Sequence, residues 1–131
     1  MDMENKVRQI RELVEAKREK FARVSDEVWA VPELYFHETK SAAILIKALK
    51  EEGFEVQEGV DGIPTAFIGT WGSGKPVIGI LGEFDALPSL SQEAGCWEHK
   101  EIVKGGPGHG CGHNALGAGP MAAAVAAKDY M

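Results

Sequence analysis

The distribution of glycine along the chain is the feature that most constrains its fold. All 16 glycines lie after residue 52, whereas 10 of the 14 lysines and arginines lie before residue 53. Glycine weakens helices and permits turns and close backbone contacts, so the two parts favour different secondary structure. The sequence therefore predicts helices in the first part and strands and loops in the second.

The first part carries the apolar pattern of amphipathic helices. Between residues 4 and 31, apolar side chains recur mostly at steps of three and four, which gives one apolar stripe on a charged surface. The pattern predicts a long helix, broken near Ser25 and ended by Pro32, whose stripe packs on the protein's own core. A second helix is expected over residues 41–52, with Gly53 as its stop signal.

Three strands are expected in the second part. Residues 54–57 alternate apolar and polar side chains, and residues 65–70 form a second candidate. Residues 76–82 hold a nearly continuous apolar run, typical of a central strand covered on both faces. The short, glycine-bearing connection at residues 72–74 predicts a hairpin between the second and third strands. With an alanine-rich last helix over residues 122–127, the fold class expected is α/β.

Composition limits the partners and the compartment. Hydrophobic residues make up 44% of the chain and charged residues 26%, values typical of a globular domain with a packed core. The formal net charge of −6 offers no basic field for nucleic acid or anionic lipid, and the longest apolar run, residues 121–127, is far shorter than the roughly 20 residues of a membrane span. Because the N-terminal residues lack the pattern of a secretory signal, a cytoplasmic protein is expected, with Cys96 and Cys111 as thiols or ligands.

The densest group of reactive side chains ends a long predicted loop, from residue 88 to about residue 112. There the sequence HGCGHN, residues 109–114, alternates glycine with functional residues. Cys111 and His113 can point at one centre, and a thiolate with an imidazole suits zinc or a similar divalent metal. A plain glycine-rich turn is an equally good interpretation, because a zinc site needs three or four protein ligands.

A second group, the sequence GEFDALP at residues 82–88, places two carboxylates just after the predicted central strand. On an extended chain Glu83 and Asp85 share one face. They could bind a cation directly, or accept the free ring N–H of a ligating histidine and fix its orientation. Simple surface acidity at a strand end is the alternative.

Together the two motifs resemble those of a known enzyme family. The sequence GEFDALPSLSQ at residues 82–92, followed by HGCGHN at residues 109–114, is similar to amidohydrolases of the aminobenzoyl-glutamate utilisation protein B type. That type belongs to the dinuclear metallopeptidases that include aminoacylases and glutamate carboxypeptidases. The resemblance covers the whole chain in order. It implies that residues 1–131 are the N-terminal part of a zinc-peptidase-like catalytic domain, with a mixed sheet flanked by helices.

The resemblance also implies a reaction and roles for single residues. The intact protein, as a possible homodimer, would hold two divalent metals, zinc or manganese, and hydrolyse the amide bond of N-acyl amino acids or small peptide-like substrates. Cys111 and His113 would be metal ligands, and Asp85 would be the acid that supports a ligand. Glu83 replaces a metal-binding histidine of the wider family, and His109 precedes the ligand pair, so the roles of these two residues stay open.

In such enzymes the catalytic glutamate and the remaining ligands follow the alanine-rich helix, so the chain by itself is expected to be inactive.

Two alternatives to this function stay open. A non-catalytic binding or interaction domain that keeps the fold is the first alternative. A nucleotide-binding fragment is the second, because GCGHNA at residues 110–115 matches the dinucleotide fingerprint with alanine last, although no convincing strand precedes it.

Overall fold

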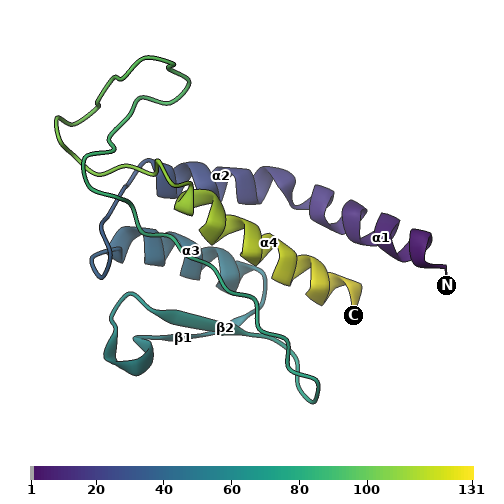
Figure 1. Ribbon diagram of the computed structural model, residues 1–131. Helices are drawn as coiled ribbons and strands as arrows, with labels where there is room; N and C mark the ends of the chain where they lie inside the picture. The colour runs from purple at the N-terminus through teal and green to yellow at the C-terminus, as the bar shows by residue number, and fades with distance from the viewer. Residues whose placement is uncertain (1) are drawn as a thin grey trace.

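The computed structural model describes residues 2–131, which form helices and a small sheet (Figure 1). This mixture of helix and strand confirms the predicted α/β class. The elements are, in chain order, α1 (Met3–Ala16), α2 (Arg18–Trp29), α3 (Thr39–Glu51), β1 (Glu55–Glu58), the short 3-10 helix η1 (Val60–Gly62), β2 (Phe67–Thr70) and α4 (His113–Tyr130). No helix in residues 2–131 is long and apolar enough to cross a membrane.

The apolar core lies where α2, α3 and α4 meet, with the two strands packed below α3 (Figure 1). Its centre is fully buried, as expected where amphipathic helices bring their apolar stripes together. The core residues are Phe21, Val24, Val28, Leu45, Ala48, Leu49, Ala118, Met121 and Val125. Helices α2, α3 and α4 therefore share one hydrophobic core, and this packing determines the position of the N-terminus of α4 in the fold.

The long N-terminal helix is broken at Lys17, so the predicted break near Ser25 is wrong. At the break, Lys17 Nζ lies 2.7 Å from Glu52 Oε2, and Lys20 Nζ lies 2.8 Å from Glu52 Oε1. Ser25 stays helical, and its hydroxyl accepts a hydrogen bond of 2.9 Å from Asn114 Nδ2 at the start of α4. The stripe of α2 is buried as predicted, whereas α1 buries no residue.

The sheet is an antiparallel pair of β1 and β2, in the register Glu55↔Thr70 to Glu58↔Phe67. A turn that contains η1 joins these two strands. The predicted hairpin between the second and third strands is wrong, because the sheet has no strand other than β1 and β2 in the described residues. Gly59 opens this turn with a φ of 67°, a left-handed backbone that favours glycine.

The predicted third strand, residues 76–82, lies outside the sheet, so the prediction of a central strand is also wrong for this chain. Its largest apolar side chains are exposed, with 85% of Val77, 78% of Ile78 and 85% of Leu81 accessible. An apolar run indicates that burial of the side chains is favourable, but it does not indicate whether a neighbouring strand is present to bury them.

The predicted long loop is confirmed, since residues 88–112 contain no helix or strand. Its two ends are held together, because Leu87 and Gly108 exchange two backbone hydrogen bonds of 3.0 Å. Leu34 and Ala86 form a further isolated bridge, in which the Ala86 N–H donates to the Glu33 carbonyl at 2.7 Å. These contacts place the two sequence motifs side by side at the N-terminus of α4.

Candidate metal centre

Three side chains with metal-ligating atoms converge at the start of α4. Glu83, Asp85 and His113 each offer one atom, and these atoms lie within 4.8 Å of one another. It is the one such group in the described residues. The two carboxylates come from the segment that enters the Ala86 bridge, and the imidazole belongs to the first residue of α4.

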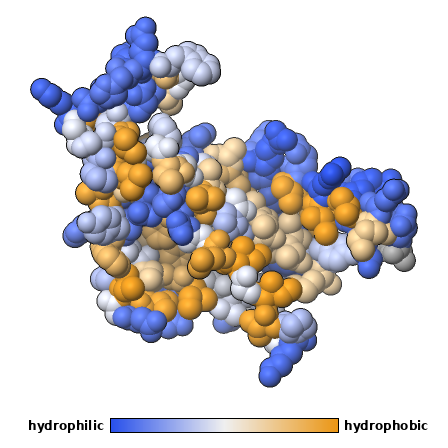
Figure 2. All heavy atoms as spheres, in the orientation of Figure 1, coloured by the Kyte–Doolittle hydropathy of each residue, from blue (hydrophilic) through white to orange (hydrophobic). Residues whose placement is uncertain are grey.

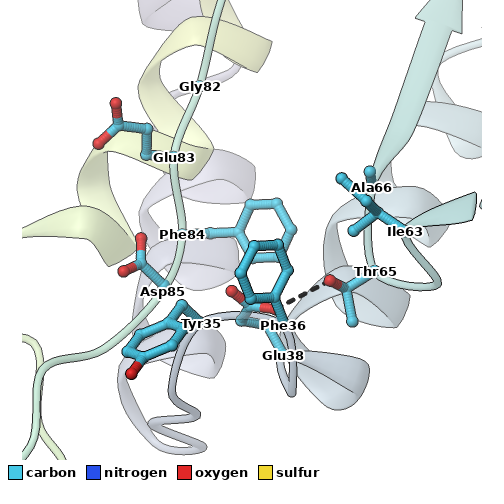
Figure 3. A pocket seen from close by; sticks show the side chains of 10 residues that line it. All are labelled: Tyr35, Phe36, Glu38, Ile63, Thr65, Ala66, Gly82, Glu83, Phe84 and Asp85. Atoms are coloured by element: carbon cyan, nitrogen blue, oxygen red, sulfur yellow. Dashed lines mark hydrogen bonds between the residues drawn. The ribbon is translucent and has the colours of Figure 1, made fainter. Parts of the chain in front are cut away.

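The local backbone explains why the two carboxylates face the helix. Gly82 passes so close to α4 that a β-carbon there would lie 3.0 Å from the Leu116 carbonyl oxygen. Along the next residues the side chains alternate, and Figure 3 shows Glu83 and Asp85 on one side of the segment and the Phe84 ring on the other. The Phe84 ring packs on Phe67 of β2, with ring centroids 5.6 Å apart. This apolar contact anchors the segment and leaves the two acids directed at His113.

The imidazole of His113 contacts both acids through different atoms. Its Nδ1 lies 2.8 Å from Asp85 Oδ1, and its Nε2 lies 3.4 Å from Glu83 Oε2. A carboxylate on Nδ1 fixes the ring and leaves Nε2 with its lone pair toward a metal. Two ligand atoms that each lie about 2.0–2.1 Å from a tetrahedral zinc ion are about 3.4 Å apart. The pair of His113 Nε2 and Glu83 Oε2 therefore fits one divalent cation, with Asp85 in the supporting position.

The structure brings together two of the three residues predicted from the sequence. Asp85 and His113 meet, whereas Cys111, exposed in the turn before α4, is not part of the convergent group. Its role as a ligand stays a prediction. Glu83 joins the group although its role was left open. The signal for it was present in the sequence, because residues 83 and 85 share a face of any extended segment.

His109 lies beside the centre and is almost completely buried, with 4% of its surface exposed. Its ring centroid lies 6.3 Å from that of Trp29, and neither ring nitrogen has a hydrogen-bond partner in the described residues. Burial lowers the pKa of His109 below its usual value. A neutral imidazole packed against an aromatic ring is therefore part of the wall, not of the cation group.

A cavity of about 510 Å³ borders the same segment, and Glu83 and Asp85 belong to its lining (Figure 3). Tyr35, Phe36 and Ile63 line it together with residues 82–85. At its floor Thr65 donates a hydrogen bond of 2.9 Å to the buried carboxylate of Glu38. The two acids of the cation group thus border a cavity whose other walls carry Tyr35, Phe36 and Ile63.

Comparison with known proteins agrees with the motifs. No family model matches the sequence. The chain is 46% identical, over 129 residues, to a p-aminobenzoyl-glutamate hydrolase subunit of Escherichia coli, a match that covers 98% of this chain and 27% of that protein. The chain belongs to the family of this hydrolase. The resemblance predicted from the two motifs is confirmed.

Other members of this family that the chain resembles are peptidases. It is 38% identical to thermostable carboxypeptidase 2 of Saccharolobus solfataricus over 85 residues, which are 63% of this chain and 21% of that protein. It is 27% identical to Xaa-Arg dipeptidase of Mus musculus over 128 residues, which are 90% of this chain and 26% of that protein. The chain therefore spans about a quarter of the length of the curated relatives that it matches.

Proposed function

We propose that the chain is the front part of a metal-dependent amidohydrolase that cleaves the amide bond of an N-acyl amino acid or a small peptide-like substrate. The relatives are named as a hydrolase, carboxypeptidases and a dipeptidase, which supports hydrolysis of this kind of bond. The observation that carries the proposal is the imidazole of His113, held at Nδ1 by Asp85 and turned with Nε2 toward Glu83.

Each residue of the centre has a distinct task in this proposal. His113 and Glu83 hold a zinc or manganese ion, Asp85 orients the imidazole, and Cys111 supplies a further ligand from the turn before α4. A divalent cation in such a site lowers the pKa of bound water and polarises a carbonyl group. The negative charges of the two carboxylates also balance the positive charge of the cation. This balance matters because the site is partly shielded from water, with 15% of the His113 side chain exposed.

The matched stretch accounts for part of such a site only. Glu83, Cys111 and His113 supply the three protein ligands of one catalytic metal, and a second metal needs further ligands. We infer that those ligands and the catalytic base come from the region of the hydrolase that the relatives carry outside the matched stretch. Residues 1–131 alone are then a folded part of the catalytic domain without turnover.

Calorimetric titration with zinc tests the proposed centre. The chain should bind about one ion with an affinity in the micromolar range, since three protein ligands leave one coordination position open. His113→Ala should abolish the binding, and the exposed His99, which lies in the long loop, provides the matched control His99→Ala. Binding that survives His113→Ala, or an unaltered chain that binds no metal, would overturn the proposal.

A further inference from the structure

A second cavity, of about 340 Å³, lies between the long loop and the connection from α2 to α3. Residues 29–33 and Lys40 form one wall, and residues 91–92, 102–103 and 107–109 of the loop form the other. None of these residues lines the cavity beside the cation group. The volume lies in the range of binding sites for small molecules, so this cavity is a candidate site separate from the metal centre.

His109 is the residue of this cavity that points to a ligand. It lines the cavity, it is 4% exposed, and neither ring nitrogen has a hydrogen-bond partner in the described residues. Burial lowers the pKa of the ring although the Val28 carbonyl acts to raise it, and that carbonyl makes no hydrogen bond of normal geometry with either nitrogen. Buried polar side chains are nearly always paired, so the N–H of the neutral ring calls for an acceptor inside the cavity.

Two further donors belong to the same lining. Ser91 is 6% exposed, and its hydroxyl oxygen accepts a hydrogen bond of 3.0 Å from the Val103 N–H. The hydroxyl proton of Ser91 is then available to donate. Lys40 is exposed at the mouth of the cavity, and its ammonium group forms no ion pair with a carboxylate in residues 2–131.

The carboxylate of Glu33 also lies on the wall, but its charge is already compensated. Its Oε2 accepts hydrogen bonds of 2.9 Å from the backbone N–H groups of Lys40 and Ser41, in the first turn of α3. A carboxylate at this position is balanced by the positive end of the helix dipole. The ammonium of Lys40 is then left as the uncompensated charge of the cavity, which favours an anionic ligand.

The rest of the lining is mostly apolar. Trp29 and Pro32 contribute from the connection, and Ile102, Val103 and Pro107 contribute from the loop. Figure 2, in the orientation of Figure 1, shows mainly hydrophilic surface at the outer end of the loop and apolar surface where the loop approaches the helices. A ligand that fits these walls therefore carries hydrocarbon next to its anionic group.

We propose that this cavity binds a small carboxylate with an apolar body. The carboxylate accepts hydrogen bonds from the His109 ring and the Ser91 hydroxyl and faces the ammonium of Lys40. The apolar body packs between Trp29 and the loop. The site goes beyond the proposed hydrolysis, because it needs neither the metal nor any residue of the cation group.

Nuclear magnetic resonance with benzoate on the metal-free chain tests the ligand class. Benzoate joins a carboxylate to an apolar ring, and we expect saturable shifts of the amides of residues 102–109 with a Kd of about 0.1–1 mM. Benzyl alcohol has the ring without the charge, and acetate has the charge without the ring. Both should bind at least about 10-fold more weakly. Absence of benzoate binding, or equal binding of either control compound, would overturn the proposal.

Substitutions locate the site. Lys40→Met keeps the apolar stem of the side chain and removes its charge, and His109→Phe keeps a ring against Trp29 and removes its donor. Each should weaken benzoate binding about 10-fold or more. Lys47→Met, on the same helix and outside the cavity, is the control that should bind as the unaltered chain does.

Thermal unfolding of the same variants guards against a loss of fold. The midpoint of Lys40→Met should be unaltered because the side chain is exposed, so this variant alone decides the question if His109→Phe fails to fold. Benzoate affinity that is unaltered in a folded Lys40→Met chain would overturn the proposal. Because chelator is present throughout, these results do not depend on whether the metal centre binds zinc.

Discussion

His113 Nδ1 and Asp85 Oδ1 lie 2.8 Å apart, although 28 residues separate them in the chain. This contact joins the first turn of the last helix to the segment that leaves the sheet. A carboxylate at this ring nitrogen fixes the tautomer and strengthens the other nitrogen as a ligand. The two residues therefore form the fixed part of the candidate centre.

Asp85→Asn should weaken zinc binding without removing it. The amide keeps the shape of the side chain and loses the charge that holds the His113 ring, and such changes around a metal ligand cost about 10–100-fold in affinity. Competition with a chromophoric chelator measures the change. Asp61→Asn, in η1, serves as the control and should leave the affinity unaltered. Equal affinities for Asp85→Asn and the unaltered chain would show that Asp85 supports no ligand.

Cys111→Ser tests the one predicted ligand that the structure leaves outside the convergent group. With cobalt in place of zinc, a thiolate ligand gives an intense charge-transfer band in the near ultraviolet, which serine cannot give. We expect this band in the unaltered chain and its loss in Cys111→Ser. Cys96→Ser, the other free cysteine, should retain the band. A cobalt complex without the band in the unaltered chain would exclude the sulfur as a ligand.

Glu52 should make stability depend on pH in the acid range. Burial by itself would raise the pKa of Glu52, and the hydrogen bonds from Lys17 and Lys20 outweigh this effect, so the pKa lies below the usual value of 4.5. A lowered pKa contributes stability that is present above the pKa of the unfolded chain and is lost as the pH falls through that of the folded chain.

Glu52→Gln should therefore be less stable than the unaltered chain by about 1–2 kcal/mol at pH 7. The difference should shrink as the pH falls below about 4.5, the usual pKa of a glutamate. Urea unfolding at a series of pH values gives both free energies. Glu58→Gln, which removes an ion pair between exposed side chains, is the control and should cost little at any pH.

Gly108→Ala should prevent the long loop from closing. A β-carbon at residue 108 would lie 1.9 Å from the Leu90 carbonyl oxygen, a distance that backbone atoms cannot accept. We expect a loss of at least about 3 kcal/mol in the free energy of unfolding, together with weaker zinc binding, because the loop leads into the candidate centre.

Gly119→Ala provides the matched control for this glycine. Its β-carbon would meet no atom within 4 Å in the described structure, and residue 119 lies within α4. Alanine there should be neutral or stabilise the helix by up to about 1 kcal/mol. Thermal unfolding of both variants measures the contrast. Similar unfolding midpoints for Gly108→Ala and Gly119→Ala would contradict the close approach of Leu90.

The sequence predicted the elements whose partners lie within the matched stretch. The buried stripe of α2 is set by residues such as Val24 and Val28, and the hydrophobic period of a helix is a local property. The start of α4 was less accessible, because the prediction covered only the alanine-rich residues 122–127, whereas the helix begins at His113, directly after Gly112 with a φ of 79°. The apolar character of residues 76–82 is plain in the sequence. Whether these residues pair as a strand depends on other segments of the chain, and the periodicity of residues 76–82 carries no information about those segments.

The candidate site shows the same division. Asp85 and His113 could be predicted because each lies in a motif dense in reactive side chains. Their contact could not be predicted, because it depends on the bridge between Leu87 and Gly108, and no local sequence pattern indicates that bridge. Glu83 was visible as a possible cation ligand by its spacing alone. The separation of Cys111 from the group depends on the rotation of the turn before α4, and a spacing of two residues does not determine that rotation.

The packing of α4 against the first two helices has a consequence for synthesis. Because α1 and α2 find their partner surface largely in the 18 residues of α4, the core cannot close while those residues are still inside the ribosome. Until then the nascent helices expose Phe21, Val24 and Val28 to solvent and to chaperones. The core of this chain is therefore expected to form after α4 has been synthesised, and not during synthesis of the first two helices.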